Sequence, residues 1–400
     1  MVVLNVCGII AEFDPFHSGH LHLIEEARKQ TGCDYTVCVL STAFLQRGTA
    51  GLFSTRDRAR MALAAGADAV FALPVSFSCA PADRFALGGV KLLSALGVVT
   101  DQAFGCESAS DLPILQQAAA CLNDETPAFR EALHANLAKG MAFPGTRAAA
   151  LESSCGINTR LLAEPNNILA VAYLRQLMRL NHPIRPVAIQ RAGSRTAESS
   201  DHEGFLPSSA IRQRLLTDGI GAVSAAVPAS TAAVIGECMA EHRLCPPEAL
   251  TQALLYRLYT TKPQEWARYS ESNEGLEDRL KKALDRHPAT REALLAALKT
   301  RRYTYAGLQR WLSHILLDLP TDQLKPEPDH LRLLGFRASA QPLMRAIRKR
   351  ASLPLITKPA RGSQYLAEDT RAELLWSLGA GQPASLYAQS PIIIPDQEDK

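Results

Sequence analysis

The sequence of 400 residues predicts an α/β fold: a Rossmann-like open parallel sheet with a helical insertion, followed by a mostly helical C-terminal domain. Three observations lead to this prediction. An apolar run over residues 2–13 ends at Asp14-Pro15, short apolar runs then alternate with amphipathic stretches up to about residue 227, and strand-like runs are scarce afterwards. Ligands of open parallel sheets gather at the carboxyl ends of the strands, so a site is expected in the turns that follow them.

The first half of the chain alternates strands and helices. Residues 2–13 form a continuous apolar run, which is typical of a strand buried on both faces. Helical spacing begins at Gly19, and apolar runs over 35–40, 69–73 and 98–104 predict three more strands. A helix that begins near Ser54 and ends at Gly66, and another over 82–96, separate these strands. We therefore expect helices on both faces of the sheet.

The pattern changes twice further along the chain. Residues 109–164 show helices and loops without a clear strand, which predicts a helical excursion from the sheet. A helix over 166–180 with Pro165 in its first turn, a strand over 184–190 and a helix from Ser208 restore the alternation. From about residue 228 onward we expect a nearly all-helical chain. The boundary predicted at Val227-Pro228 gives domains of residues 1–227 and 228–400.

The composition excludes several classes of protein. Hydrophobic residues make up 47% and charged residues 21% of the chain, which is ordinary for a globular protein and excludes disorder. The formal net charge of +3 does not by itself indicate polyanion binding. The nine cysteines include no Cys-x-x-Cys pair, so we expect reduced thiols and no metal site. The apolar N-terminus is too short for a membrane span and lacks the basic residues of a signal peptide, so a cytoplasmic protein is expected.

The turn after the first predicted strand carries the pattern His-x-Gly-His at His17 to His20. With ten histidines and 24 glycines, this pattern has a chance of roughly 1–2% of occurring anywhere in the chain. Phosphates dock at helix N-termini, and Gly19 leaves room for one there. Both imidazoles could then donate hydrogen bonds as charge builds during attack on an α-phosphorus, so His17 and His20 are predicted to be catalytic. The alternative is that both histidines only cap the helix.

The segment from Gly8 to His22 resembles the opening of the bacterial tRNA(Met) cytidine acetate ligase family, a branch of the HIGH-motif nucleotidyltransferases. Further segments resemble that family in the same order, and the resemblance extends from residue 6 to at least 358. They are Phe44-Leu45-Gln46-Arg47-Gly48, Arg58-Ala59-Arg60-Met61-Ala62-Leu63, Leu73-Pro74-Val75, Phe104-Gly105-Cys106-Glu107, Pro165-Asn166-Asn167-Ile168-Leu169 and Leu355-Ile356-Thr357-Lys358.

The resemblance implies a two-step reaction. Acetate attacks the α-phosphate of ATP to give acetyl-adenylate, and the wobble cytidine of elongator tRNA(Met) then takes the acetyl group on N4, without acetyl-CoA. It also implies that residues 1–227 bind ATP and that residues 228–400 bind tRNA. The residues that the resemblance assigns to the nucleotide are Ile10, Ala11, Glu12, Phe13, Asp14, Pro15, Phe16, His17, Ser18, Gly19, His20, Leu21, His22, Leu23, Gly105, Asn167 (with Asn166 as the alternative register) and Arg191. Because the reaction uses ATP, Mg²⁺ is expected as a cofactor.

A second segment, Leu206 to Arg212, resembles the Ile-Ser-Ser-Thr-x-x-Arg segment of related nucleotidyltransferases. Ser208, Ser209 and Arg212 are therefore candidates for holding the departing pyrophosphate. The alternative is an ordinary helix cap at Ser208, with Arg212 exposed to solvent.

The chain departs from the family pattern at several positions. It has Thr42-Ala43 where the family usually has Gly-Asn, and Ser54-Thr55 where Asp-Lys is common. A Tyr-His-Asp near the strand after Arg191 is matched only loosely, by residues 199–202, and Ala306-Gly307 stand in place of a Thr-Arg pair. A basic group is therefore expected to be missing near the phosphates, and a divergent acceptor stays open.

Two basic clusters are candidates for contact with tRNA. Arg301, Arg302 and Arg310 are interleaved with Tyr303, Tyr305 and Trp311, whose rings could stack on unpaired bases. Residues 331–361 carry eight basic residues and no acidic one. Within them, a predicted helix places Leu343 and Ile347 on a buried side, and its candidate contacts are Arg345, Arg348, Lys349 and Arg350. The alternative for both clusters is a solvated helix face with core aromatics.

These observations favour an ATP-dependent tRNA cytidine acetate ligase, with ATP, acetate and tRNA as partners. A small-molecule adenylyltransferase on the same turn is the first alternative, although about 170 helical residues after the sheet exceed its needs. A nucleotide- or RNA-binding relative without turnover is the second.

Overall fold

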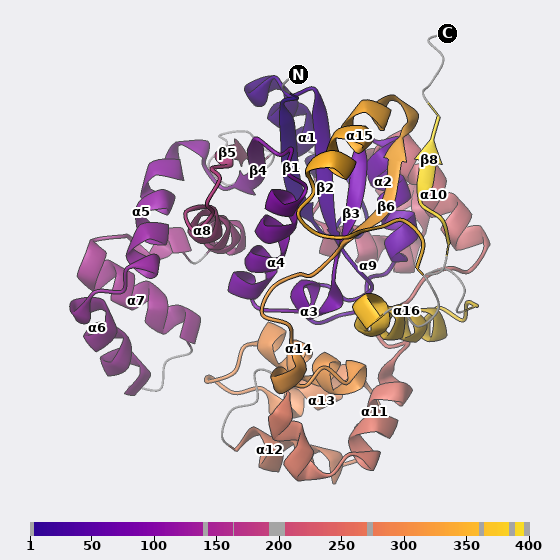
Figure 1. The fold of residues 1–400 in the computed structure, drawn as a ribbon. Coiled ribbons are helices and arrows are strands. Elements are labelled where there is room, and N and C mark those ends of the chain that lie inside the picture. Colours follow the sequence, from indigo (N-terminus) through magenta and orange to yellow (C-terminus); the bar gives the residue numbers. More distant parts are fainter. Residues whose placement is uncertain are drawn as a thin grey trace.

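The computed structural model describes residues 4–138, 143–162, 164–191, 205–269, 275–359, 364–383 and 389–395. Within these ranges the centre of the molecule is an eight-stranded sheet in the order β5-β4-β1-β2-β3-β6-β7, with β8 paired to β6. The five strands from the first half of the chain all run parallel: β1 (Val6–Ala11), β2 (Tyr35–Ser41), β3 (Ala69–Leu73), β4 (Asp101–Cys106) and β5 (Arg185–Gln190). The predicted open, Rossmann-like α/β fold is confirmed (Figure 1).

Helices cover both faces of this sheet. Alternate residues of β1 point to opposite faces, so Val6 and Ile10 enter one core while Cys7 and Ile9 enter the other. The first core is completed by α4 (Ala82–Ala95), α5 (Leu112–Asn123), α6 (Pro127–Ala138), α7 (Phe143–Cys155), α8 (Pro165–Leu177) and α15 (Gln341–Arg350). The second is completed by α1 (Ser18–Thr31), α2 (Thr55–Ala64), α9 (Ser208–Asp218) and α10 (Ala229–Ala240).

A third core lies at the carboxyl end of the sheet. It joins α11 (Thr251–Thr260), α12 (Leu276–Leu284), α13 (Arg291–Leu298), α14 (Tyr305–Leu317) and α16 (Ala367–Gly379) to α3 (Val75–Ser78) and the loop that follows β2. In Figure 1 this bundle lies below the sheet, whereas α5, α6 and α7 form the helical excursion to one side. Cores are thus shared by residues on both sides of the boundary predicted at Val227-Pro228, because α10 and α15 pack on the sheet.

The prediction of a nearly all-helical chain after residue 228 was wrong in one respect. Three strands from this region join the sheet: β6 (Leu331–Arg337), β7 (Leu355–Ile356) and β8 (Ile392–Ile394). β6 runs antiparallel to β3 and carries a register shift opposite Val70 and Phe71. Its sequence includes Arg332 and Gly335, which interrupt the apolar run, and strands of two or three residues leave no periodic pattern.

Two general features follow from the described residues. All nine cysteines are free thiols, as the sequence indicated. No helix within the described ranges is both long and apolar enough to cross a membrane.

Candidate active site

The His-x-Gly-His segment forms the turn between β1 and α1, at the carboxyl end of the central strand. His17 is the N-cap of α1, and its Nδ1 accepts a hydrogen bond from the backbone N–H of Gly19 at 3.1 Å. The backbone N–H of His17 in turn donates to Nδ1 of His20 at 3.3 Å, and the two rings stack with centroids 3.7 Å apart. The capping role that was the alternative interpretation is therefore present in the structure.

Capping leaves both imidazoles able to donate. A neutral imidazole carries one proton, and a ring nitrogen that accepts a hydrogen bond is the unprotonated one. Because Nδ1 accepts in both histidines, the proton resides on Nε2, which remains free to donate to a ligand. Capping the helix and donating to a phosphate are thus compatible functions of the same ring.

The surroundings of the turn keep both rings neutral. Burial lowers the pKa of His17 to about 4, and the nearby Arg191 and Arg212 guanidinium groups act in the same direction. Burial also places the pKa of His20 well below its ordinary value, with His17 and Arg191 lowering it as well. Near pH 7 the turn therefore presents uncharged hydrogen-bond donors at the positive end of a helix.

Hydrogen bonds of Asp14, Arg58 and Arg212 hold the turn in place. Both carboxylate oxygens of Asp14 accept backbone N–H bonds, from Leu52 at 2.9 Å and from Phe53 at 3.1 Å. The fully buried Arg58 donates from Nη1 to the carbonyl oxygen of Glu12 at 2.8 Å. Arg212 of α9 donates from Nη1 to the carbonyl oxygen of Asp14 at 2.6 Å. These bonds fix the path of the backbone from Glu12 to Asp14, directly before the cis Asp14-Pro15 peptide.

The neighbouring strands bring further polar groups to the same edge. Gly105 lies on β4 beneath the side chain of Arg191, which follows β5. Arg191 lies 3.5 Å from the carboxylate of Glu107, which also accepts a 2.7 Å hydrogen bond from the amide of Asn166. The buried Asn167 donates to the carbonyl of Leu161 and accepts from the N–H of Glu107. The amide of Asn167 is thus engaged with backbone groups, whereas that of Asn166 is paired with a side chain.

These elements enclose a cavity of about 1470 Å³ at the carboxyl end of the sheet. Ligand pockets typically measure about 300–1,000 Å³, so the cavity has room for more than one small ligand. Nearly all the candidate nucleotide and pyrophosphate residues line it: Ile10, Ala11, Glu12, Phe13, Asp14, His17, Gly19, His20, His22, Leu23, Gly105, Asn166, Asn167, Arg191, Ser208, Ser209 and Arg212.

Four candidate nucleotide residues do not line this cavity. Pro15 is buried, and Phe16 is fully buried in the core that joins α1 to the sheet. Leu21 packs against that same core, and the hydroxyl of Ser18 donates to the carbonyl of Ala226 at 3.0 Å. Helical geometry explains the positions of Ser18 and Leu21, because residues on the far side of the first turn of α1 face the protein and not the ligand.

The candidate tRNA residues lie in two separate places. Arg301 and Arg302 are exposed just before α14, and Arg345, Arg348, Lys349 and Arg350 are exposed on α15, which Figure 1 shows beside the sheet and away from α14. Arg310 is buried, lines the cavity and donates to the carbonyl of Gln46 at 3.3 Å.

The expected stacking aromatics need a correction. Trp311 is fully buried and its indole N–H donates to the carbonyl of Trp266, and Tyr303 is also buried in the third core. Trp311 lies on the inner side of α14, and Tyr303 enters the same core from the segment that precedes the helix. Of the three aromatic residues, Tyr305 is exposed. Residue 361 of the second basic cluster lies outside the described ranges.

Sequence reasoning missed several residues that line the cavity. Gln46 and Arg47 follow β2, Glu107 follows β4, and Arg160 comes from the helical excursion. Arg47 and Arg160 are exposed, so their guanidinium groups are available to a phosphate. The signal for Gln46, Arg47 and Glu107 was available, because each lies in a loop after a predicted parallel strand. No such rule applies to Arg160.

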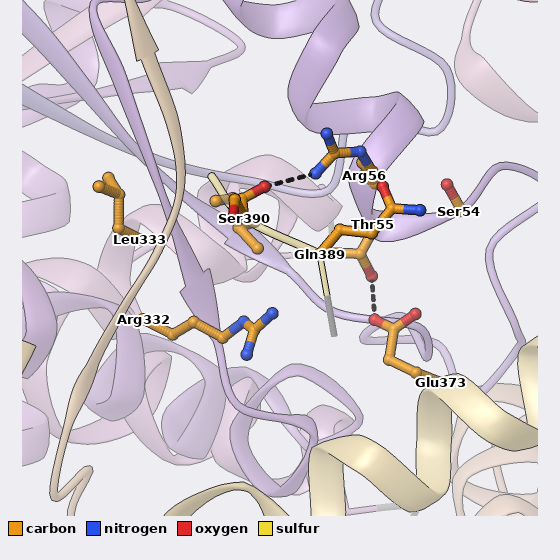
Figure 2. Close-up of a pocket in the computed structure, with 9 residues that line it drawn as sticks. Ser54, Thr55, Arg56, Arg332, Leu333, Glu373, Gln389 and Ser390 are labelled. Atoms are coloured by element: carbon orange, nitrogen blue, oxygen red, sulfur yellow. Dashed lines mark hydrogen bonds between the residues drawn. The ribbon is translucent and has the colours of Figure 1, made fainter. Parts of the chain in front are cut away.

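The family departures at residues 42–43 and 54–55 lie outside this cavity. Thr42 and Ala43 are fully buried, and Ser54 caps α2 by accepting from the N–H of Asp57. Thr55 donates to the carboxylate of Glu373 in α16 at 2.5 Å (Figure 2). A separate cavity of about 30 Å³, with room for about two water molecules, is lined by Ser54, Thr55, Arg56, Arg332, Leu333, Leu334, Glu373, Gln389 and Ser390.

The other two departures are placed differently. Ala306 lines the large cavity from the first turn of α14. Residues 199–202 lie outside the described ranges. Among the described residues, no group of three or more His, Cys, Asp or Glu side chains is arranged to hold a metal ion.

The family model for HIGH Nucleotidyl Transferase matches residues 4–389. A tRNA(Met) cytidine acetate ligase from Leuconostoc citreum (strain KM20) is 34% identical over 404 residues, covering 97% of each chain. The enzyme of the same name from Syntrophomonas wolfei subsp. wolfei (strain DSM 2245B / Goettingen) is 36% identical over 371 residues, covering 90% of this chain and 88% of that one. This chain belongs to the tRNA(Met) cytidine acetate ligase family of HIGH nucleotidyl transferases.

Solved structures of this family agree with the assignment. The crystal structure of Thermotoga maritima TmcAL bound with alpha-thio ATP superimposes with a TM-score of 0.90 at 27% identity, covering 98% of this chain and all of that one. The apo form of the same protein gives a TM-score of 0.89 at 28% identity. The family assignment favours the acetate-ligase interpretation over a small-molecule adenylyltransferase or an RNA-binding relative without turnover.

Proposed function

We propose that this protein uses ATP to activate acetate as acetyl-adenylate and then transfers the acetyl group to N4 of the wobble cytidine in elongator tRNA(Met). The observation that carries the proposal is the position of the His-x-Gly-His turn. It lies at the floor of one cavity with room for a nucleotide and a second ligand, and that cavity is bounded by both the sheet and α14.

ATP is proposed to bind with its phosphates at the N-terminus of α1. The N-terminal end of α1 favours anions, and the Nε2 groups of His17 and His20 would donate to the α-phosphate as acetate attacks it. Arg191, which follows β5, and Ser208, in the first turn of α9, are proposed to contact the phosphates, since both line the cavity. Arg212 would stabilise the departing pyrophosphate from its position against Asp14.

Mg²⁺ is proposed to enter with ATP, because triphosphates bring this ion with them and the protein usually supplies few ligands of its own. Both carboxylate oxygens of Asp14 accept hydrogen bonds from backbone N–H groups, and Arg212 lies 3.7 Å from one of them. Phosphate oxygens and water are therefore the proposed principal ligands of the ion.

tRNA is proposed to contact two exposed basic areas. One is Arg301 and Arg302 near α14, and the other is Lys349 with the three residues named here the α15 arginines: Arg345, Arg348 and Arg350. The buried face of α15, formed by Leu343 and Ile347, packs on the sheet core and fixes the direction of these side chains. Arg310 is proposed to meet the acceptor nucleotide itself, because it is buried at the cavity. A tRNA substrate and nine free thiols support a cytoplasmic location.

The experiment is mass spectrometry of tRNA nucleosides after incubation with enzyme, ATP and isotopically labelled acetate. We expect labelled N4-acetylcytidine that depends on both ATP and acetate and is absent when acetyl-CoA replaces them. Exchange of labelled pyrophosphate into ATP that requires acetate would measure the first step separately. The His20→Ala variant is the control for adventitious acetylation, and a product formed equally by this variant would refute the proposed site.

A further inference from the structure

Glu12 occupies an unusual position for a residue of a phosphate-binding turn. It directly follows β1 and lines the large cavity together with His17 and His20. Its Oε1 accepts a 2.6 Å hydrogen bond from the backbone N–H of Gln46, and its carbonyl oxygen is held by Arg58. The backbone on both sides is fixed, so the carboxyl group has a defined place at the carboxyl edge of the sheet.

The charge of Glu12 does not suit the ligands of the first reaction step. ATP and acetate are anions, and a carboxylate beside them repels both. Burial raises the pKa of Glu12, and the carboxylate of Asp14 raises it further, whereas the N–H of Gln46 and the guanidinium groups of Arg212 and Arg58 lower it. These groups face Glu12 from the turn, from the loop after β2, and from α9 and α2. The phenol of Tyr173 on α8 also lies close enough for the charge of Glu12 to raise its pKa, and it lines the same cavity.

The second reaction step contains one ligand that does suit a carboxylate. The exocyclic N4 amine of cytosine is a hydrogen-bond donor, and Glu or Asp is the side chain that accepts from it. The amine must also lose a proton when it becomes an amide, and a partly buried carboxyl group is a suitable general base. The acceptor cytidine is thus the substrate that matches Glu12 in both respects.

Hydrogen bonds link Glu12 to α14, the helix that carries Arg310. The backbone of Gln46 connects Glu12 to α14. Its N–H donates to Glu12, and its carbonyl oxygen accepts from Arg310 at 3.3 Å. Thr304 and Ala306 line the cavity beside Arg310. Glu12 is thus tied to the side of the cavity formed by α14, and Gly105 of β4 and Asn166 of α8 line the same cavity.

We infer that Glu12 is a catalytic residue of acetyl transfer, which accepts a hydrogen bond from N4 of the acceptor cytidine and takes its proton. This inference rests on the proposed function. N4 attacks the carbonyl carbon of acetyl-adenylate, a C–N bond forms, and the bond from that carbon to the AMP phosphate oxygen breaks. AMP leaves with the electron pair of that bond, the N4 proton passes to the carboxylate of Glu12, and the proton is later released to water.

The test compares the two steps in the variants Glu12→Gln, Glu12→Asp and Glu164→Gln. Gln retains the oxygen that accepts from Gln46, so Glu12→Gln is expected to fold, and Glu12→Asp keeps the charge but withdraws it by one methylene. Glu164 is the matched control, because it lines the same cavity from the N-terminus of α8 and has the same charge. The first step is measured as acetate-dependent pyrophosphate exchange, and the second as single-turnover transfer from acetyl-adenylate to tRNA.

For Glu12→Gln we expect transfer to slow by about 10²–10⁴-fold, the usual contribution of a general base, while exchange changes by less than about tenfold. Wild-type transfer should rise with pH through an apparent pKa above the ordinary glutamate value, and that dependence should disappear in Glu12→Gln and persist in Glu12→Asp. Glu164→Gln should transfer at nearly the wild-type rate, which separates a specific base from a loss of charge in the cavity.

Three outcomes would overturn the inference in distinguishable ways. If Glu12→Gln transferred normally, the carboxyl group would have no part in the second step. If exchange fell as much as transfer, and excess Mg²⁺ restored it, Glu12 would serve the nucleotide and its metal. If the wild type exchanged pyrophosphate but acetylated no tRNA, the proposed acceptor would be wrong and the inference would fall with it.

Discussion

Replacing His17 by alanine and by serine separates the two functions that the structure assigns to one ring. His17 caps α1 through Nδ1 and is left with Nε2–H as a donor toward the cavity. Alanine removes both functions. Serine restores a side-chain oxygen that can cap the helix, since serine is among the preferred N-cap residues, but its hydroxyl is too short to replace Nε2.

The magnitudes of the two effects differ enough to be told apart. Loss of an N-cap costs about 0.5–2 kcal/mol of stability, which leaves a domain with about 5–15 kcal/mol of stability folded at room temperature. Loss of a donor aimed at developing charge reduces the rate by about 10²–10³. His17→Ala should therefore lower both the melting temperature and the exchange rate, whereas His17→Ser should recover most of the melting temperature and none of the rate.

The measurements are thermal unfolding and acetate-dependent pyrophosphate exchange at saturating ATP for all three proteins. Binding of alpha-thio ATP serves as the control, because the variants should retain most of their ground-state affinity if the donor acts chiefly in the transition state. Wild-type exchange in His17→Ser would refute the reasoning, since it would show that the imidazole serves only as a cap.

Three further predictions follow from the same structure. Because the pKa of His17 lies near 4, about 1% of this ring is protonated at pH 6. The rate of pyrophosphate exchange should therefore show no histidine-dependent decline between pH 8 and 6. A decline centred near pH 6.5 that His17→Ser abolishes would contradict this. Burial raises the pKa of Asp369 to about 7, so the native state keeps a proton that the unfolded state releases above about pH 4. The free energy of unfolding should therefore fall as pH rises from about 4 to 7. Asp369→Asn should flatten that fall when it is measured by urea unfolding. Replacing the α15 arginines with glutamate should flatten the log–log salt dependence of tRNA binding by roughly 0.7–0.9 for each phosphate that the protein no longer neutralises, while exchange persists; an unchanged slope would remove α15 from the interface.

The sheet could be predicted well because its central strands are buried on both faces. Such strands give continuous apolar runs, and the run over 69–73 coincides with β3 (Ala69–Leu73). Helix caps could also be recognised from the sequence, since Ser54 is the N-cap of α2 as expected. β6 was missed for the opposite reason. Its Arg332 is buried beside α16, and a buried arginine in a strand looks like a surface residue until its tertiary surroundings are known.

The helix over residues 341–350 shows where sequence periodicity stops being informative. Its amphipathic pattern predicted a buried side at Leu343 and Ile347, and both residues are fully buried. The pattern did not say what covers that side. We expected a helical domain, but the covering surface is the central sheet, reached through the neighbouring β6 and β7. Periodicity identifies which face of a helix is apolar, whereas the partner depends on contacts between residues far apart in sequence.

The structure changes the interpretation of Thr42 and Thr55, two departures from the family pattern, because both residues contact α16. From the sequence, we expected a basic group to be missing near the phosphates, since Thr55 stands where the family commonly has a lysine. In the structure Thr55 donates to Glu373, and the hydroxyl of Thr42 lies 3.5 Å from the carboxylate of Asp369. Both carboxyl groups belong to α16 and are buried, and burial raises the pKa of each.

A lysine at position 55 would form an ion pair with Glu373 in this setting. Neither residue lines the large cavity. The hydroxyl of Thr55 can replace it because it supplies the hydrogen bond that a buried carboxyl group requires. These substitutions therefore adjust how α16 docks on the sheet. They leave the ligand-facing part of the turn unchanged, from Glu12 through His20, so they give no physical reason to expect a different acid or a different acceptor.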